Sequence, residues 1–304
     1  MKAATSNERF LPWIDAEANS QRDSRLVFAL VLGLTIVAIT ILMVNPTGWL
    51  GSDDAAYHSA AEQVLCGSKI ERLHHHYARL AMILPIVVSM WSLGDHVTAV
   101  ILPTFLASII CMWVVIALGK SLWGWWEGLV AAGIVAMLPY YRVLSTTAFP
   151  DVHVCLWCSV SMFLAVKAAG VRGAYSIEKN DLFRADGPSR QALLAVLSGF
   201  TLGAAISAKV FAIACALPTI MILLHRGSRS RAADSPQVTQ RPSRWKLIFL
   251  YTGGWALFLL MEGAFYHVVS GDFLFPLRAA MHSQSNVPGM TDDATGASHL
   301  ADIV

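Results

Sequence analysis

The chain of 304 residues is too apolar to have water as its main solvent. Hydrophobic residues make up 56% of it and charged residues only 14%, whereas soluble domains carry about 25% charged residues. The net charge of +2 does not indicate nucleic-acid binding, because the basic residues alternate with apolar spans instead of clustering on one face. The composition therefore indicates a polytopic membrane protein and excludes a nucleic-acid-binding one.

The N-terminal part predicts a cytoplasmic segment followed by a membrane anchor. Residues 1–25 are polar and of mixed charge, and residues 26–44 contain no charge at all. That uncharged run has about the length that a bilayer core requires. No small-residue cleavage site follows it, so we expect an uncleaved anchor. Of the five cysteines, only Cys66 lies outside the apolar runs and is expected to reach water.

Apolar runs predict an all-α bundle of about seven transmembrane spans within residues 26–270. The run from Gln191 to His225 would be about 52 Å long as one helix, too long for a core of about 30 Å. We therefore expect it to turn back near Lys209. The predicted spans lie near residues 26–44, 96–118, 122–139, 150–168, 191–207, 209–225 and 247–269.

The distribution of basic residues predicts the orientation of the bundle. With a cytoplasmic N-terminus, most of the 22 lysines and arginines fall on the inner side, as the positive-inside rule requires. Six fall on the outer side: Lys69, Arg72, Arg79, Arg142, Lys209 and Arg278. The longest outer segment is then the loop at 45–95, in which residues 77–93 predict a juxtamembrane helix.

Three acids are expected at the outer ends of helices. Asp53 and Asp54 open a short helix that Ser52 could cap, and Asp151 follows Pro150 at the start of the fourth span. Each position is also explained by helix-start chemistry alone. The shared membrane face favours a functional reading, in which the carboxylates act as a general base and as a ligand for a hydroxyl or metal.

A run of three histidines, His74 to His76, lies in the same outer loop. Imidazole suits a metal or a phosphate, so His74 and His76 are candidate ligands of a divalent metal ion. Three consecutive side chains are not expected to point the same way on a helix or strand. A basic surface cluster near lipid headgroups is therefore the alternative reading.

Taken in order, these features resemble the GT-C class of integral-membrane glycosyltransferases, specifically glycosyltransferase family 39, the protein O-mannosyltransferase and aminoarabinose-transferase group. The matching features are the acidic pair followed by Tyr57, the Gly-Asp pair at 94–95 before a span, Asp151, and GFTLGAAISAKVFAIACALP with Lys209. The resemblance extends over about residues 40–225.

This resemblance implies transfer of a sugar from a polyprenyl-phosphate donor to a hydroxyl of a lipid, glycan or protein acceptor on the extracytoplasmic face. Asp53 would then be the general base with Asp54 beside it, and Asp151 would position the acceptor or help to hold a divalent metal. Candidate substrate contacts are Tyr57, Arg79, Arg142 and Lys209, the last three as cations for the departing phosphate. The expected location is the inner or plasma membrane of a bacterium.

Two other readings compete with the enzyme. A transporter or flippase of a lipid-linked or small polar substrate would place its polar residues at mid-membrane, whereas Asp53, Asp54 and Asp151 are expected at the outer edge. Members of the family usually continue with further spans, and residues 271–304 form a polar outer tail without another apolar run. We therefore also expect an incomplete C-terminal part, which leaves an inactive truncated homologue as the third reading.

Overall fold

The computed structural model describes residues 12–44, 47–51, 53–70, 74–171, 187–225 and 242–285. Within these ranges all regular secondary structure is helical, which confirms the all-α fold class. The outer tail beyond residue 285, the suggested cap Ser52 and Arg72 lie outside the described residues. The α-helices are α1 (Pro12–Val44), α2 (Asp53–Leu65), α3 (Leu80–Leu93), α4 (Val97–Leu122), α5 (Trp125–Met137), α6 (Pro139–Ser145), α7 (Pro150–Ala169), α8 (Pro188–Ala208), α9 (Ala216–Leu224), α10 (Arg244–Ser270) and α11 (Phe275–Ser285), with 3-10 helices η1 (His75–Ala78) and η2 (Val210–Cys215).

Long apolar helices coincide with the predicted spans. Within the described residues α4, α7, α8 and α10 are long and apolar enough to cross a bilayer, and α5 with α6 forms a fifth candidate that is bent by 74°. The remaining two predicted spans, near 26–44 and 209–225, coincide with shorter apolar helices over Phe28–Val44 and Val210–Leu224. α1 itself begins at Pro12, well before the predicted start of its span.

The predicted turn at Lys209 is confirmed. α8 ends at Ala208, and Lys209 adopts an extended backbone with φ −161° and ψ 124° before η2 begins. Near the end of α9, Leu223 belongs to the same buried cluster as Ala165 of α7 and Leu247 of α10. The chain therefore turns back along the bundle after Lys209.

Glycines let α8 and α10 pack with their backbones in close approach. A Cβ atom added at Gly199 of α8 would lie 1.8 Å from the carbonyl oxygen of Tyr251, and one at Gly254 of α10 would lie 2.0 Å from that of Val196. Small residues at helix contacts are typical of membrane bundles, where dispersion forces replace hydrophobic burial as the driving force. This contact fixes the position of α8, at whose end Lys209 stands, relative to α10.

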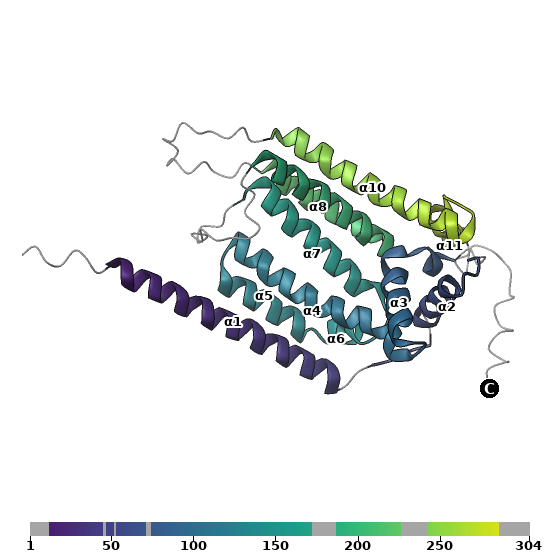
Figure 1. The fold of residues 1–304 in the computed structure, drawn as a ribbon, viewed down its shortest axis with the longest axis horizontal. Helices are drawn as coiled ribbons and strands as arrows, with labels where there is room; N and C mark the ends of the chain where they lie inside the picture. The colour runs from purple at the N-terminus through teal and green to yellow at the C-terminus, as the bar shows by residue number, and fades with distance from the viewer. Residues whose placement is uncertain are drawn as a thin grey trace, which may run out of the picture.

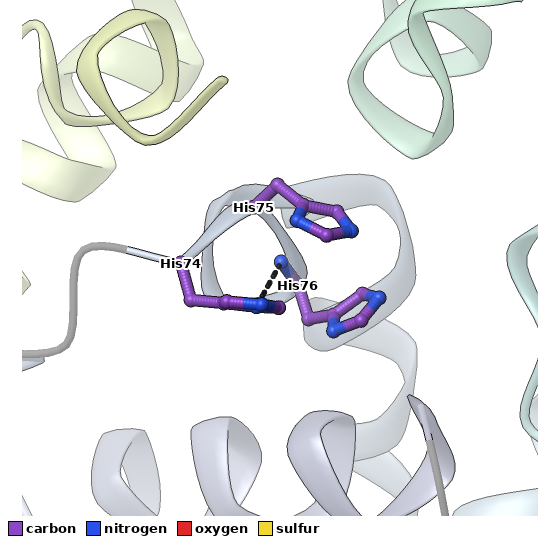
Figure 2. A group of neighbouring side chains, drawn as sticks. All are labelled: His74, His75 and His76. Atoms are coloured by element: carbon purple, nitrogen blue, oxygen red, sulfur yellow. Dashed lines mark hydrogen bonds between the residues drawn. The ribbon is translucent and has the colours of Figure 1, made fainter. Parts of the chain in front are cut away.

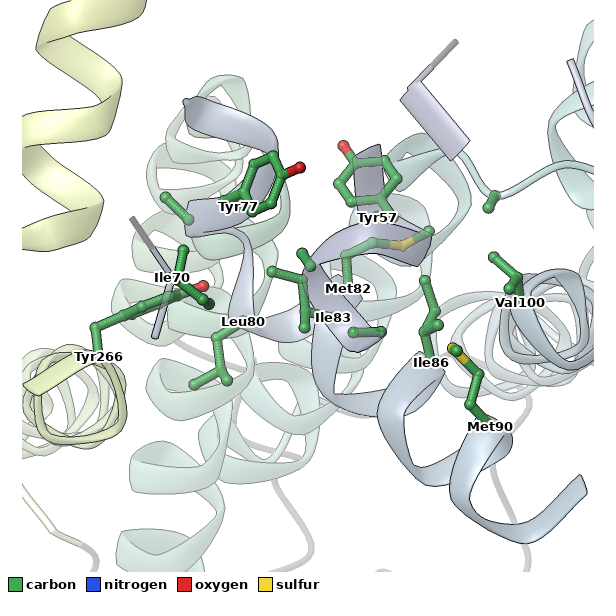
Figure 3. Close-up of a cluster of buried hydrophobic side chains, with 14 of the residues drawn as sticks. Tyr57, Ile70, Tyr77, Leu80, Met82, Ile83, Ile86, Met90, Val100 and Tyr266 are labelled. Carbon is green, nitrogen blue, oxygen red and sulfur yellow. The ribbon is translucent and has the colours of Figure 1, made fainter. Parts of the chain in front are cut away.

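The segments α2, η1, α3 and α11 gather at one end of the bundle (Figure 1), opposite the end at which α10 begins. Their shared core includes the fully buried Tyr57 of α2, Met82 and Ile83 of α3, and Tyr266 of α10 (Figure 3). The helix predicted within residues 77–93 is thus confirmed over Leu80–Leu93. Neither α6 nor α11 was predicted from the sequence.

Candidate functional site

A polar cavity of about 430 Å³ lies where α2, η1, α6, α7 and the break after α8 meet. Segments that are far apart in the sequence thus contribute to one site. The predicted meeting of Asp53 with Asp151 is found here, since both line the cavity. The lining residues are Asp53, His75, His76, Arg79, Tyr140, Val143, Leu144, Phe149, Pro150, Asp151 and Lys209.

Backbone contacts explain why α2 starts beside α7. The N–H of Gly48 donates to the carbonyl oxygen of Thr146 at 3.1 Å, and the N–H of Thr47 donates to the Thr146 hydroxyl at 3.0 Å. The loop before α2 is therefore bound to the turn that precedes α7. This arrangement places the first residue of α2, Asp53, near the first turn of α7.

Asp53 and Asp151 both stand in the first turns of their helices, where a carboxylate complements the helix dipole. Their partners differ. Asp53 Oδ2 lies 3.2 Å from His76 Nε2, whereas Asp151 Oδ1 accepts a hydrogen bond from Lys209 Nζ at 2.7 Å. Both carboxylates are about one-third exposed, which leaves them accessible from the cavity.

Lys209 reaches Asp151 because α8 stops one residue earlier. The extended backbone at Lys209 interrupts the apolar run between α8 and η2, and the residue lies at the end of the bundle that carries the cavity. A lysine there avoids the penalty of a charge within the apolar core. The same break that allows the chain to turn back therefore supplies a cation to the site.

Arg79 is held by Tyr57 at the cavity wall. Its Nη1 donates a hydrogen bond to the Tyr57 hydroxyl, and the guanidinium lies 5.8 Å from the centre of the ring. Tyr57 itself is fully buried and does not line the cavity. Burial raises the pKa of the Tyr57 hydroxyl well above its usual range, so this group remains neutral and accepts from Arg79.

A buried polar chain fixes the start of α3, directly after Arg79. The N–H of Ala81 donates to Ser207 Oγ at 3.3 Å, and Ser207 Oγ donates to Glu262 Oε1. Glu262 is only 4% exposed and does not line the cavity. Glu262 therefore faces the interior of the bundle and positions the start of α3 through Ser207.

The rings of the three histidines lie close together, although three consecutive side chains were not expected to point the same way. Their ring centres lie 4.4, 4.6 and 4.0 Å apart. The expectation was wrong because the run is neither regular helix nor strand: His74 is extended, with φ −128° and ψ 142°, and η1 begins at His75. The N–H of His76 then donates to His74 Nδ1 at 3.4 Å (Figure 2).

Their surroundings keep these imidazoles uncharged. Burial, together with the charges of Arg79 and His74, lowers the pKa of His75 to about 4. Burial, with His75 and Arg79 nearby, lowers the pKa of His76 to about 3. The cavity wall also carries two acidic side chains, Asp53 and Asp151, and two basic ones, Arg79 and Lys209.

Besides Tyr57 and His74, two further predicted site residues do not line the cavity. Asp54 is fully buried and accepts a hydrogen bond from the N–H of Leu50 at 2.6 Å, so it fixes the loop before α2. Arg142 lies on α6 but is not part of the cavity wall. The aromatic residues Tyr140 and Phe149 do line it and were missed. Their signal was their position close to Asp151 at the outer ends of the predicted spans.

The fold and this cavity define a class: a polytopic helical membrane protein with a polar, charged site at one end of its bundle. Residues 77–176 match the model of a family described as dolichyl-phosphate-mannose-protein mannosyltransferase. The match covers about a third of the chain, from the end of η1 to just beyond α7, and includes Arg79 and Asp151.

The family match confirms the resemblance to GT-C glycosyltransferases that the motifs predicted, and with the apolar helices it indicates a membrane glycosyltransferase. No curated protein and no solved structure matches the chain.

Proposed function

We propose that this protein transfers a sugar from a polyprenyl-phosphate donor to an acceptor hydroxyl at the outer membrane face, with Asp53 as the general base. One observation carries the proposal: a carboxylate and two cations from segments far apart in the sequence line a single cavity. Sugar transfer from a phosphate needs this pairing, because a proton must leave the acceptor while negative charge develops on the departing phosphate.

Asp53 suits the base better than Asp151 does. The oxygen of Asp151 nearest to Lys209 is already occupied by a 2.7 Å ion pair. Asp53 instead faces the neutral imidazole of His76. In the proposed step the acceptor oxygen attacks the anomeric carbon, the bond from that carbon to the phosphate oxygen breaks, and Asp53 takes the acceptor proton.

Arg79 and Lys209 would stabilise the leaving group. The phosphate leaves as polyprenyl phosphate with one more negative charge than it carried in the donor, and preorganised cations lower the free energy of such a transition state. Tyr57 holds Arg79 from behind, so the guanidinium is positioned before the substrate binds. Asp151 holds Lys209 in the same way and would lie near the acceptor.

An apolar hollow close to the cavity supports a lipid-linked donor. It has a volume of about 200 Å³ and is lined by side chains of α3, α7, α8 and α10, among them Leu84, Trp157 and Phe258. Leu80, which also lines it, directly follows Arg79 of the cavity wall. A donor with its phosphate at Arg79 would therefore have an apolar surface within reach for its first prenyl units.

The location of the charged groups favours this enzyme over a transporter. Transporters hold substrate near the bilayer midplane on broken helices. Here the cavity lies at the end of the bundle where α4 and α7 begin.

The test is the variant Asp53→Asn, assayed in membranes with radiolabelled polyprenyl-phosphate mannose. We expect release of polyprenyl phosphate to fall by about 100-fold or more, the range of a lost general base. Asp95→Asn is the matched control, because Asp95 is also an acid of the first outer loop but pairs with His58 away from the cavity. Turnover by Asp53→Asn at the rate of this control would refute the proposed base.

A further inference from the structure

The three-histidine cluster offers more nitrogen donors than the proposed sugar transfer uses. One ring nitrogen of each of His74, His75 and His76 can be chosen so that all three lie within 4.8 Å of one another. In a tetrahedral site with metal to nitrogen distances of about 2.0–2.1 Å, neighbouring nitrogens stand about 3.3 Å apart. Small side-chain rotations would therefore close the cluster around one ion.

The local backbone preorganises this cluster. His74 is the N-cap of η1, and its Nδ1 accepts from the N–H of His76, which leaves Nε2 of His74 for another partner. The rings of His75 and His76 follow within the first turn of η1, and both reach the cavity (Figure 2).

Asp53 stands where a metal-bound histidine commonly finds its outer partner. A ligating imidazole usually donates its other ring N–H to a carboxylate, which fixes the tautomer and the orientation of the ring. Asp53 Oδ2 lies 3.2 Å from Nε2 of His76, so Nδ1 of His76 would be the ligand atom.

We propose that His74, His75 and His76 form a binding site for a divalent transition-metal ion of the zinc type, with Asp53 as the outer partner of His76. Three imidazoles favour zinc, cobalt or nickel over magnesium and calcium, which prefer oxygen ligands. Three protein ligands leave a fourth position open, on the side of the cavity. Metal binding here does not depend on sugar transfer and can be measured without it.

The test is a titration of the purified full chain in detergent with Co²⁺, using an affinity tag without histidine. We expect one bound ion per chain, a visible absorption band of tetrahedral Co²⁺, and displacement of the ion by Zn²⁺. His75→Gln and His76→Gln should each weaken binding by more than about tenfold. Asp53→Asn should weaken it by about 10–100-fold, as outer partners do.

Two further variants separate lost ligands from lost structure. His74→Asn keeps a side-chain acceptor at the N-cap of η1 but removes the imidazole, so it should lose binding while its elution volume and melting temperature stay unchanged. His96→Gln changes an exposed histidine outside the cluster and should bind like the unaltered chain. Absence of a stoichiometric ion, or equal binding by His74→Asn and His96→Gln, would overturn the site.

Discussion

Replacing Tyr57 tests whether the position of Arg79 matters for sugar transfer, because Tyr57 contacts Arg79 but does not line the cavity. Its hydroxyl accepts a hydrogen bond from Arg79 while its ring is fully buried. Tyr57→Phe keeps the ring but removes the acceptor, and hydrogen bonds to charged groups contribute about 1.5–3 kcal/mol. We expect kcat for sugar transfer to fall by about 10–100-fold.

Tyr77 provides the matched control for this change. It is buried in the same cluster (Figure 3), and within the described residues no hydrogen bond of its hydroxyl is found. Tyr77→Phe should therefore leave kcat unaltered. If both variants lose activity equally, the loss comes from the packing of the cluster and not from the position of Arg79.

The sequence predicts site residues best where they are ionisable and stand beside an apolar run, because the bilayer penalises a charge there. Asp53, Asp151, Arg79 and Lys209 are ionisable groups beside apolar runs, and such groups are retained where they face a site; all four line the cavity. Asp54 has the same sequence signal as Asp53, yet its side chain faces the loop before α2. Only the direction of each side chain separates them. That direction depends on the loop before α2, which is bound to Thr146 about 100 residues further along the chain, and no local pattern encodes this contact.

At the scale of helices, the contact between α8 and α10 makes the sharpest prediction. Gly253 and Gly254 are neighbours in α10, but a Cβ at Gly254 would meet a backbone oxygen at 2.0 Å, whereas one at Gly253 meets nothing within 4 Å. Gly254→Ala should separate the helices and destabilise the fold by about 1–3 kcal/mol. Gly253→Ala should change stability by less than about 0.5 kcal/mol.

Thermal unfolding of the two variants in detergent measures this difference. A clear loss of melting temperature in Gly254→Ala alone would support the close approach of the two backbones. Equal melting temperatures would contradict it, because the two substitutions change composition and helix propensity identically.

The lengths of the apolar runs predicted the long helices and one of their interruptions, but not the others. The turn at Lys209 was predictable because a run of 35 residues exceeds the bilayer. The 74° bend between α5 and α6 was not predicted, although Pro139 at the start of α6 is a helix-start signal. His74 and His76 were candidate ligands from the sequence, but the close approach of all three histidine rings was not expected, because it forms at a junction of extended and 3-10 backbone, where helix and strand periodicities do not apply.

For the whole molecule, the proposed reaction requires the cavity to lie at the extracytoplasmic end of the bundle. Lys120, Lys167, Arg190 and Lys246 stand near the ends of α4, α7, α8 and α10 that lie away from the cavity. The positive-inside rule places such ends in the cytoplasm. Orientation and chemistry are thus coupled, because the opposite orientation would expose Asp53 and Lys209 to the cytoplasm.

Cysteine labelling tests this orientation directly. Cys66 is exposed just after α2, at the cavity end, while Ser189 is exposed at the start of α8, at the other end. A membrane-impermeant maleimide added to intact spheroplasts should label Cys66, because its thiol would face the outside. In a Cys66→Ser background, Ser189→Cys should be labelled only after the membrane is permeabilised, and Cys66→Ser alone gives the labelling of the remaining cysteines. The reverse pattern would place the cavity in the cytoplasm, where the charged site could not serve an acceptor on the outer face.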